Sequence, residues 1–597
     1  MADGLTRADI YSEFNSHKID DEKQRFDFHV TGRTGWINDP NGFSWYDGKI
    51  HLFYQHNPYS NSWGPMHWGH VTGTDFVKWN YEKIALTPDN PAYDAQLGAF
   101  SGSAIFFKGR YYLVYTGCNV GRQTQCIAVS DDGVSFTKYA GNPVLSKKDL
   151  PKGASVANFR DPKVWEKDGT VYMIVSAKNR RNGRSRLLLY ATENMTDWQY
   201  RGVVFSNSDS KYANQFAIKF GIKSANKFGS KFINRFAGKL DRKSDSNSAG
   251  KSDSTSSSEF INGYAGKSNN LSGLGRMLEC PDIFELDGTD VLIVSPQNIP
   301  GHRNKHASVY ITGKLNYVGG ALSPIGKNAD MRLFSPATTD AGGALSPVGK
   351  NADILLFSPE NTDAGSALSN ANGNAVCEID YGLDFYAPQT MLMPDGRRIM
   401  VAWMATWNRA PINALLKHGY AGALTFPREL TLFGGRLYQN PVKEIENYYT
   451  GAYRAQADIS AGETRYIDEM SGKTQDIAVE FPRGVGKTGI SVFDDEAGNG
   501  LRVYYENGKV YLDRSDVIRN FYKSDTEKIS SCGVPSDTQN IKIRLLTDKY
   551  SCEVFVNDGY SAMTATVAPY ENQRKTAVFS DNPAAVSIVR HAITVNA

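Results

Sequence analysis

Apolar and aromatic residues along this chain fall into short runs separated by tight turns, and one turn recurs five times. In each copy a Gly, preceded by Asp in four of the five, is followed after one or two residues by an apolar strand. The copies are Gly48 before IHLFYQH, Gly109 before YYLVYTG, Gly169 before VYMIVSA, Gly288 before VLIVSPQ and Gly396 before IMVAWM. Asp-Gly between apolar runs is a strong hairpin signal, because Gly accepts the positive φ of the favoured turns. The pattern therefore predicts five β-hairpins.

The spacing of the hairpins predicts a repeated unit. Successive Gly positions are 61, 60, 119 and 108 residues apart, and each long spacing contains an unusual segment. The first, 206–275, is rich in Ser, Asn, Lys and Gly; the second, 316–373, holds GGALSPIGKNAD and GGALSPVGKNAD in tandem. Without these inserts, five units of about 60 residues remain, and radially repeated four-stranded sheets form a β-propeller.

A different pattern follows Leu430. Short strands such as DIAVEFP, LRVYYENGKVYLDRS and CEVFVNDG alternate with turns, which is typical of a second antiparallel unit, most simply a β-sandwich. The predicted fold is therefore all-β: a lead-in over 1–30, a five-bladed β-propeller over 31–440, and a C-terminal antiparallel β-sandwich over 441–597.

The insert 206–275 carries a net charge of +6, from 9 Lys and 2 Arg against 4 Asp and 1 Glu. Five Phe between 216 and 236 alternate with Lys, so a basic amphipathic helix that binds a membrane or an acidic partner is one interpretation. A spacing of four drifts by ~40° per step, and Gly and Ser interrupt the stripe, so a mobile insert is the favoured interpretation. The tandem repeat in 316–373 is expected to be an expanded loop, because two short copies cannot bury a core.

Three carboxylates occupy similar points of the repeat. Counting back eight or nine residues from each hairpin Gly reaches Asp39, Phe100, Asp161, Glu279 and Ala387, at the start of each innermost strand. Innermost strands line the channel of a propeller, so we expect the three acids to meet at one mouth. Crowded acids repel one another and lose hydration, which indicates a functional site. Asp161 is offset by one residue, so strand alternation turns it away unless a bulge compensates.

Such a set suits a retaining glycosidase. In that chemistry one carboxylate attacks the anomeric carbon, and a second carboxyl, kept protonated, gives a proton to the leaving oxygen.

The motifs around these acids resemble those of glycoside hydrolase family 32, the invertase, levanase, inulinase and sucrose-6-phosphate hydrolase group. WINDPNG, FSGS, FRDP, ECPD and DFYAP occur in the family's order, and HLFYQHNPYSNSWGPMHWGH is similar to the bacterial intracellular members. The resemblance covers the propeller and the sandwich apart from the inserts. It implies retaining hydrolysis of terminal non-reducing β-D-fructofuranosides, such as sucrose, sucrose 6-phosphate or short fructans.

The resemblance also implies a role for each acid. Asp39 in NDPNG is expected to form the fructosyl-enzyme intermediate, Glu279 in ECPD to act as general acid/base, and Asp161 in RDP to hold fructose hydroxyls. Further matches are Asn38, Gln55, Ser101 and Arg160 as hydrogen-bonding residues, Trp63, Phe100 and Trp403 as apolar walls, and, more weakly, Tyr386 in DFYAP. Sugars present hydroxyls together with flat C–H faces, so they need polar and aromatic side chains in one site. Cys280 is expected to be a packed neighbour of the acid/base.

The composition gives no support for a nucleic-acid, membrane or metal partner. The formal net charge of +3 makes no case for nucleic acid, and no run approaches the ~20 apolar residues of a membrane span. The N-terminus is charged where a secretory signal needs an apolar run, and six Cys form no disulfide scaffold or CxxC pattern. His67 and His70 lack a third metal ligand at a recognisable spacing. We therefore expect a cytoplasmic protein with a small sugar substrate and no cofactor, metal, nucleic-acid or membrane partner; its oligomeric state stays open.

Several alternatives remain open. A transfructosylase uses the same covalent intermediate but passes it to a sugar. An inverting five-bladed glycosidase acting on arabinose or xylose polymers needs a water between carboxyls roughly 6.5–9.5 Å apart, against ~5–5.5 Å for retention. Outside enzymes, the alternative is a catalytically impaired sugar-binding homologue, or a chain whose inserts obstruct its site. The sequence does not choose among sucrose, sucrose 6-phosphate, inulin and levan.

Overall fold

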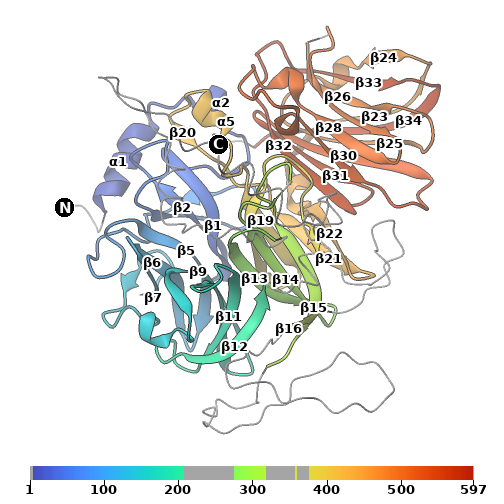
Figure 1. The fold of residues 1–597 in the computed structure, drawn as a ribbon. Helices are drawn as coiled ribbons and strands as arrows, with labels where there is room; N and C mark the ends of the chain where they lie inside the picture. Colours follow the sequence, from blue (N-terminus) through green and yellow to red (C-terminus); the bar gives the residue numbers. More distant parts are fainter. Residues whose placement is uncertain are drawn as a thin grey trace, which may run out of the picture.

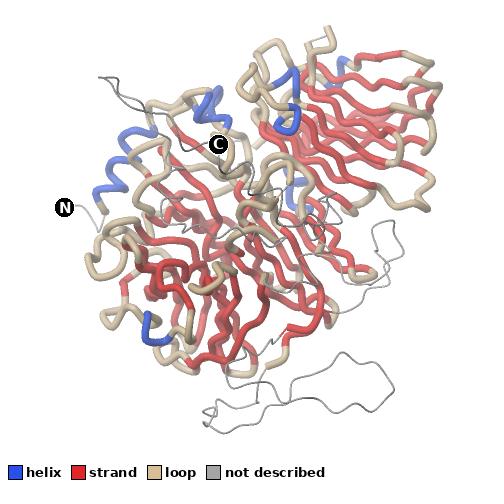
Figure 2. Tube along the Cα trace, in the orientation of Figure 1, coloured by secondary structure: helices blue, strands red, loops and turns tan. Residues whose placement is uncertain are grey.

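The computed structural model describes residues 5–207, 274–300, 302–317, 357–359, 376–495 and 497–595. These residues form two parts that lie side by side (Figure 1), and strands dominate both of them (Figure 2). Helices are short where the chain is described: α1 (Arg7–Ser16), α2 (Asp21–Gln24) and α5 (Ile412–Leu415). Most of the predicted inserts 206–275 and 316–373 lies outside the described residues, so their interpretations stay predictions.

Five small sheets make up the first part. The first contains β1 (Gly35–Tyr46), β2 (Lys49–Asn57), β3 (His67–Gly73), β4 (Asn80–Tyr81) and β20 (Tyr420–Ala421). The second contains β5 (Gly98–Phe107), β6 (Arg110–Asn119), β7 (Arg122–Ser130) and β8 (Thr137–Lys138). The third contains β9 (Ala154–Lys167), β10 (Thr170–Asn179), β11 (Ser185–Thr192) and β12 (Gln199–Ser206).

The last two small sheets follow the first predicted insert, and one strand of the fourth sheet, β16, lies within the second predicted insert. The fourth contains β13 (Leu278–Leu286), β14 (Thr289–Pro296), β15 (Val309–Leu315), β16 (Phe357–Pro359) and β17 (Cys377–Glu378). The fifth contains β18 (Tyr386–Leu392), β19 (Arg398–Trp403), β21 (Arg428–Phe433) and β22 (Arg436–Pro441). The five predicted hairpins are confirmed: each joins the first two long strands of one sheet, and each hairpin Gly has a positive φ.

The first strands of the five sheets form a closed ring of contacts. β1 contacts β5 and β18, β5 contacts β9, β9 contacts β13, and β13 contacts β18. β20 pairs in parallel with β1, with Gly35 opposite Tyr420, so a late segment of the chain joins the first sheet. The ends of the first predicted insert also lie together, because the Asn207 Nδ2 atom donates to the Gly275 carbonyl at 3.0 Å.

The second part consists of two six-stranded sheets. One contains β23 (Tyr449–Ile459), β34 (Ala584–Ile593), β25 (Gln475–Pro482), β30 (Asn540–Asp548), β31 (Ser551–Val556) and β32 (Ser561–Thr566). The other contains β24 (Glu463–Tyr466), β33 (Lys575–Ser580), β26 (Thr488–Asp494), β27 (Leu501–Glu506), β28 (Lys509–Asp513) and β29 (Ile529–Gly533). Alternate residues of β27 and β28 are buried, and their apolar side chains join one core cluster with residues of the facing sheet such as Ile477 and Ile543. Burying each such side chain contributes roughly 1.5–3 kcal/mol.

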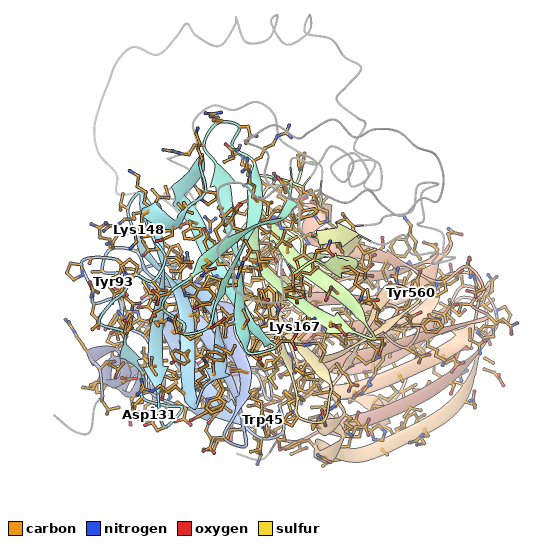
Figure 3. The ribbon with its side chains drawn as sticks, turned by 90° about the horizontal axis from the view of Figure 1, so that it is seen from below. Trp45, Tyr93, Asp131, Lys148, Lys167 and Tyr560 are labelled. Atoms are coloured by element: carbon orange, nitrogen blue, oxygen red, sulfur yellow. The ribbon has the colours of Figure 1, made fainter. Side chains whose placement is uncertain are left out.

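Polar contacts join the two parts. Arg436 of β22 donates to the backbone oxygen of Tyr560 at 2.8 Å and lies 3.6 Å from its ring centroid. Figure 3 labels Tyr560 on the C-terminal part. His29, in the predicted lead-in, lies between Asp548 at 2.8 Å and Glu553 at 3.0 Å, and all three side chains are fully buried. The lead-in is therefore packed against the C-terminal part.

His29 makes the stability of the protein depend on pH. Burial lowers its pKa, but the bonds to Asp548 and Glu553 outweigh burial and raise that pKa to about 9. The stabilisation by protonated His29 is complete below its unfolded pKa of about 6.5 and is lost as the pH rises through about 9. We expect His29→Gln to lower the melting temperature at pH 6.5. The melting temperature of this variant should then fall less between pH 6.5 and 9 than that of the wild type. His17→Gln is the control. An equal decrease in melting temperature between pH 6.5 and 9 in the wild type, His29→Gln and His17→Gln would contradict the role of His29.

Candidate active site

Each of the five first strands is interrupted at a matching depth, next to the candidate site. In three strands the interruption consists of a residue and the proline after it: Asp161-Pro162, Cys280-Pro281 and Ala387-Pro388. In β1 it consists of Asn38 and Asp39, directly before Pro40. In β5 the unpaired residue is Ser101. A bulge breaks the alternation of side chains, so two successive residues can face the same side of the sheet.

The bulges decide how the three acids face the site. Relative to the prolines, Asp39 and Asp161 align with Cys280, whereas Glu279 aligns with Arg160. The prolines and the hairpin Gly residues therefore give alignments of Glu279 with Asp39 that differ by one residue. Asp161 is not turned away by its offset, because the chain bulges there with a φ of 66°, as it does at Cys280 with a φ of 45°.

The three predicted acids come together through two bridging residues. Arg160 Nη2 donates to Glu279 Oε1 at 2.7 Å, and Arg160 Nε lies 3.8 Å from Asp161 Oδ2. The Cys280 backbone N–H donates to Asp161 Oδ2 at 3.1 Å, and its thiol Sγ lies 3.5 Å from Asp39 Oδ2. Consecutive residues of β9 and of β13 thus contribute to one site, as the bulges allow.

The two oxygens of Asp39 differ in their surroundings. Oδ2 accepts a hydrogen bond from Ser101 Oγ at 2.7 Å, while Oδ1 is buried and has no hydrogen-bond partner among the described residues. Burial raises the pKa of Asp39, and the hydrogen bond from Ser101 acts against that increase. A buried oxygen without a donor is costly, so Oδ1 is suited to an incoming electrophile.

Glu279, in contrast, has donors at both oxygens. The Tyr386 hydroxyl lies 2.8 Å from Oε2, and Arg160 binds Oε1. The Tyr386 hydroxyl also lies 2.9 Å from the Ser295 carbonyl, so its single proton has two acceptors in reach. Tyr386, the weakest of the predicted site residues, is thus in direct contact with Glu279.

Asp161 is held in the folded protein at a cost in stability. Burial is the main cause that raises its pKa to about 7, with Glu279 and Asp39 adding to the increase and Arg160 opposing it. For an acid with a raised pKa, the folded state binds more protons, so this penalty is absent below pH ~4 and complete above pH ~7.

We therefore expect Asp161→Asn to raise the free energy of unfolding, and with it the melting temperature. The gain in free energy should be larger at pH 8 than at pH 5, by an amount on the order of 3 kcal/mol. The same variant should lose roughly 10²-fold or more in turnover, because a preorganised charge is removed from the site. Thermal unfolding at the two pH values measures the first effect. Asp168→Asn, in an exposed turn on the same strand pair, is the control; equal behaviour of the two variants would refute the assignment.

Aromatic residues form a cluster with Cys280 and Tyr386, which contact these acids. Trp63 and Phe100 are partly exposed, with ring centroids 5.9 Å apart. Trp403 is fully buried, and its ring centroid lies 5.7 Å from that of Trp36 and 5.0 Å from that of Trp407. Trp403 thus packs in the same cluster as Trp63 and Phe100. Trp36 and Trp407 also belong to this cluster and were not predicted from the sequence.

Polar neighbours complete the surroundings. Trp36 Nε1 donates to Asn38 Oδ1 at 2.8 Å, a contact that its place in WINDPNG could have suggested. Gln55 Nε2 donates to the Ala99 carbonyl at 2.9 Å and so fixes the strand that carries Phe100 and Ser101. In the described ranges, no three His, Cys, Asp or Glu side chains form a group that could hold a metal ion. No helix in those ranges is long and apolar enough to cross a membrane.

The fold and the cluster of carboxylates define a glycoside hydrolase. The family model "Glycosyl hydrolases family 32 N-terminal domain" matches residues 29–217, 247–343 and 347–441, and the corresponding C-terminal model matches residues 444–595. The chain therefore belongs to glycosyl hydrolase family 32.

Individual proteins agree with the family models. The chain is 28% identical to a sucrose-6-phosphate hydrolase of Escherichia coli, over 94% of this chain and 92% of that protein. It is also 28% identical to a levanase of Bacillus subtilis, over 94% of this chain and 69% of that one. Its fold is similar to that of a Bombyx mori GH32 β-fructofuranosidase variant in complex with sucrose, with a TM-score of 0.67, 24% identity, and coverage of 98% and 97% of the two chains.

Proposed function

We propose that this protein is a retaining β-fructofuranosidase, which hydrolyses terminal non-reducing β-D-fructofuranosides such as sucrose, sucrose 6-phosphate or short fructans. The observation that carries the proposal is the contrast between the two acids. Asp39 has one buried oxygen without a partner among the described residues, whereas Glu279 has a donor at each oxygen. The names of the relatives, a sucrose-6-phosphate hydrolase and a levanase, support fructosides as the substrate class.

In the proposed mechanism, Asp39 Oδ1 attacks the anomeric carbon of the fructosyl unit. Glu279 gives its proton to the leaving oxygen, so the bond to the second sugar breaks as the bond to Asp39 forms. Glu279 then accepts a proton from the water that releases fructose from Asp39. Asp161 accepts hydrogen bonds from fructose hydroxyls, and Trp63 and Phe100 pack against the sugar.

We further propose that the five small sheets are the blades of a β-propeller over residues 31–440, followed by a β-sandwich over 441–597. The closed ring of contacts among β1, β5, β9, β13 and β18 supports this arrangement. Parallel pairing of β20 with β1 would then close the ring between the last blade and the first. We also propose a cytoplasmic location, on the basis of the six cysteine thiols.

Hydrolysis is tested by incubating the full chain with sucrose, sucrose 6-phosphate and inulin while free fructose and the second product are measured. The proposal predicts fructose release, with the β-anomer formed first when NMR spectra are recorded immediately. First formation of the α-anomer would indicate inversion. Fructosyl oligosaccharides without free fructose would indicate a transfructosylase, and no product from any substrate would refute an active enzyme.

A further inference from the structure

The segment that enters β18 is built into the C-terminal part. The Tyr381 N–H donates to the Ala562 carbonyl at 2.8 Å, and the Leu383 N–H donates to the Thr564 carbonyl at 2.7 Å. The Leu383 side chain belongs to the core cluster between the two six-stranded sheets. Residues 380–384 therefore run along β32 as an additional edge, although they lead directly into the fifth small sheet.

Asp384 is the last fixed point of this segment. Its Oδ2 atom accepts from Arg514 Nη1, and from both the backbone N–H and the hydroxyl of Thr566 at 2.8 Å. Its Oδ1 atom accepts from Arg409 Nη2 at 2.9 Å. Burial raises the pKa of Asp384, but the charges of Arg514 and Arg409 outweigh burial and keep that pKa below its usual value. Asp384 is thus an anion held between the two parts of the molecule.

Arg514 is itself rigidly held. Its side chain is fully buried, and it donates to the Thr566 carbonyl at 2.7 Å and to the Glu527 carbonyl at 2.8 Å. Because a guanidinium presents its donors in one plane, these contacts fix where the Asp384 carboxylate can lie. Without Arg514, the Asp384 carboxylate would still accept the hydrogen bond from Arg409 and would turn toward that side chain.

Only one residue, Phe385, lies between Asp384 and Tyr386, whose hydroxyl lies 2.8 Å from Glu279 Oε2. We propose that Arg514 is a positioning residue: through Asp384 it sets the start of β18 and so holds the Tyr386 hydroxyl on Glu279. This inference rests on the proposed role of Glu279 as general acid/base. A displacement of about 1 Å in such a chain of contacts can cost roughly 10²-fold in rate.

The test compares Arg514→Met, Arg514→Lys and Tyr386→Phe in the full chain, by kcat, KM, melting temperature and the pH profile of kcat/KM. We expect Arg514→Met to lower kcat roughly 10²-fold with little change in KM. We expect the alkaline limb of its profile to move upward, as in Tyr386→Phe, because ionised Glu279 loses a donor in both. Arg514→Lys should restore part of each effect.

Two further variants keep the test decisive. Thr566→Val removes only the hydroxyl that donates to Asp384, so it should fold even if Arg514→Met does not. It should move the alkaline limb of the pH profile in the same direction as Arg514→Met, but by less. Arg544→Met breaks the 2.6 Å pair with Asp476 inside the C-terminal part, so it should lower the melting temperature without moving the pH profile.

A double variant tests whether the two residues act along one path. If they do, Arg514→Met added to Tyr386→Phe should move the limb no further than Tyr386→Phe alone. Additive shifts, or an unchanged profile in Arg514→Met and Thr566→Val while Tyr386→Phe moves it, would overturn the positioning role alone. Full activity of Glu279→Gln would instead overturn the proposed function.

Discussion

Replacing Asp39 by Asn is expected to lower kcat for sucrose by roughly 10⁵-fold, within the range seen when a covalent nucleophile is removed. The side chain keeps its size, and its amide oxygen can still accept the hydrogen bond that Ser101 donates to Oδ2 at 2.7 Å in the wild type. The melting temperature should therefore not fall, since burial raises the pKa of Asp39 and its charged form is a cost to the folded state.

Fructose release and thermal unfolding measure these two quantities. Asp47→Asn is the matched control, because Asp47 lies in the exposed turn at the other end of the same strand. Mass spectrometry of wild-type protein quenched during turnover should find a fructosyl group on the peptide that contains Asp39. Turnover of Asp39→Asn within tenfold of wild type, or a fructosyl group on another peptide, would show that a different residue is the nucleophile.

Replacing Glu279 by Gln is expected to lower kcat/KM for sucrose by roughly 10²–10⁴-fold, because a general acid/base is removed. The loss should depend on the leaving group. A fructoside whose leaving group departs without a proton should regain most of the first step, and the covalent intermediate should then accumulate, because the water lacks its base.

The measurement compares initial burst and steady-state rates for sucrose and for such an activated fructoside. Glu285→Gln, which alters an exposed residue on the same strand, should behave as wild type. Equal losses for both substrates without accumulation of the intermediate would exclude Glu279 as the acid/base.

The hairpins could be predicted from sequence because their cause is local. Asp47 and Gly48 both adopt positive φ, and the same two-residue turn recurs at 108–109, 168–169 and 287–288. The bulges also have a local signal in the sequence, because a proline recurs in four of the five first strands. Proline lacks the N–H that a strand pair needs, so it marks the place where pairing is interrupted. Counting from the hairpin Gly does not use this signal, so it gives an alignment of Glu279 that differs by one residue from the alignment on the prolines.

Other features have no local signal. Arg514 is 130 residues from Asp384, and no pattern in either stretch indicates that they meet. His29 and Glu553 are further apart still, at 524 residues. The burial of Trp403 follows from its packing against Trp36 and Trp407, so its tryptophan identity alone could not show whether it lines the site or supports it.

The residues before the four prolines have a consequence for engineering. Asp39, Asp161 and Cys280 show that side chains at this position are delivered to one small volume from different strands. Ala387 occupies the same position in β18 but ends at its Cβ atom, and its backbone N–H is already fixed by Ser295 Oγ at 3.1 Å. Ala387 is buried among apolar side chains such as Trp36 and Trp403. A designer who adds a functional group at this point of the rigid strand would therefore have to trim one of these neighbours as well.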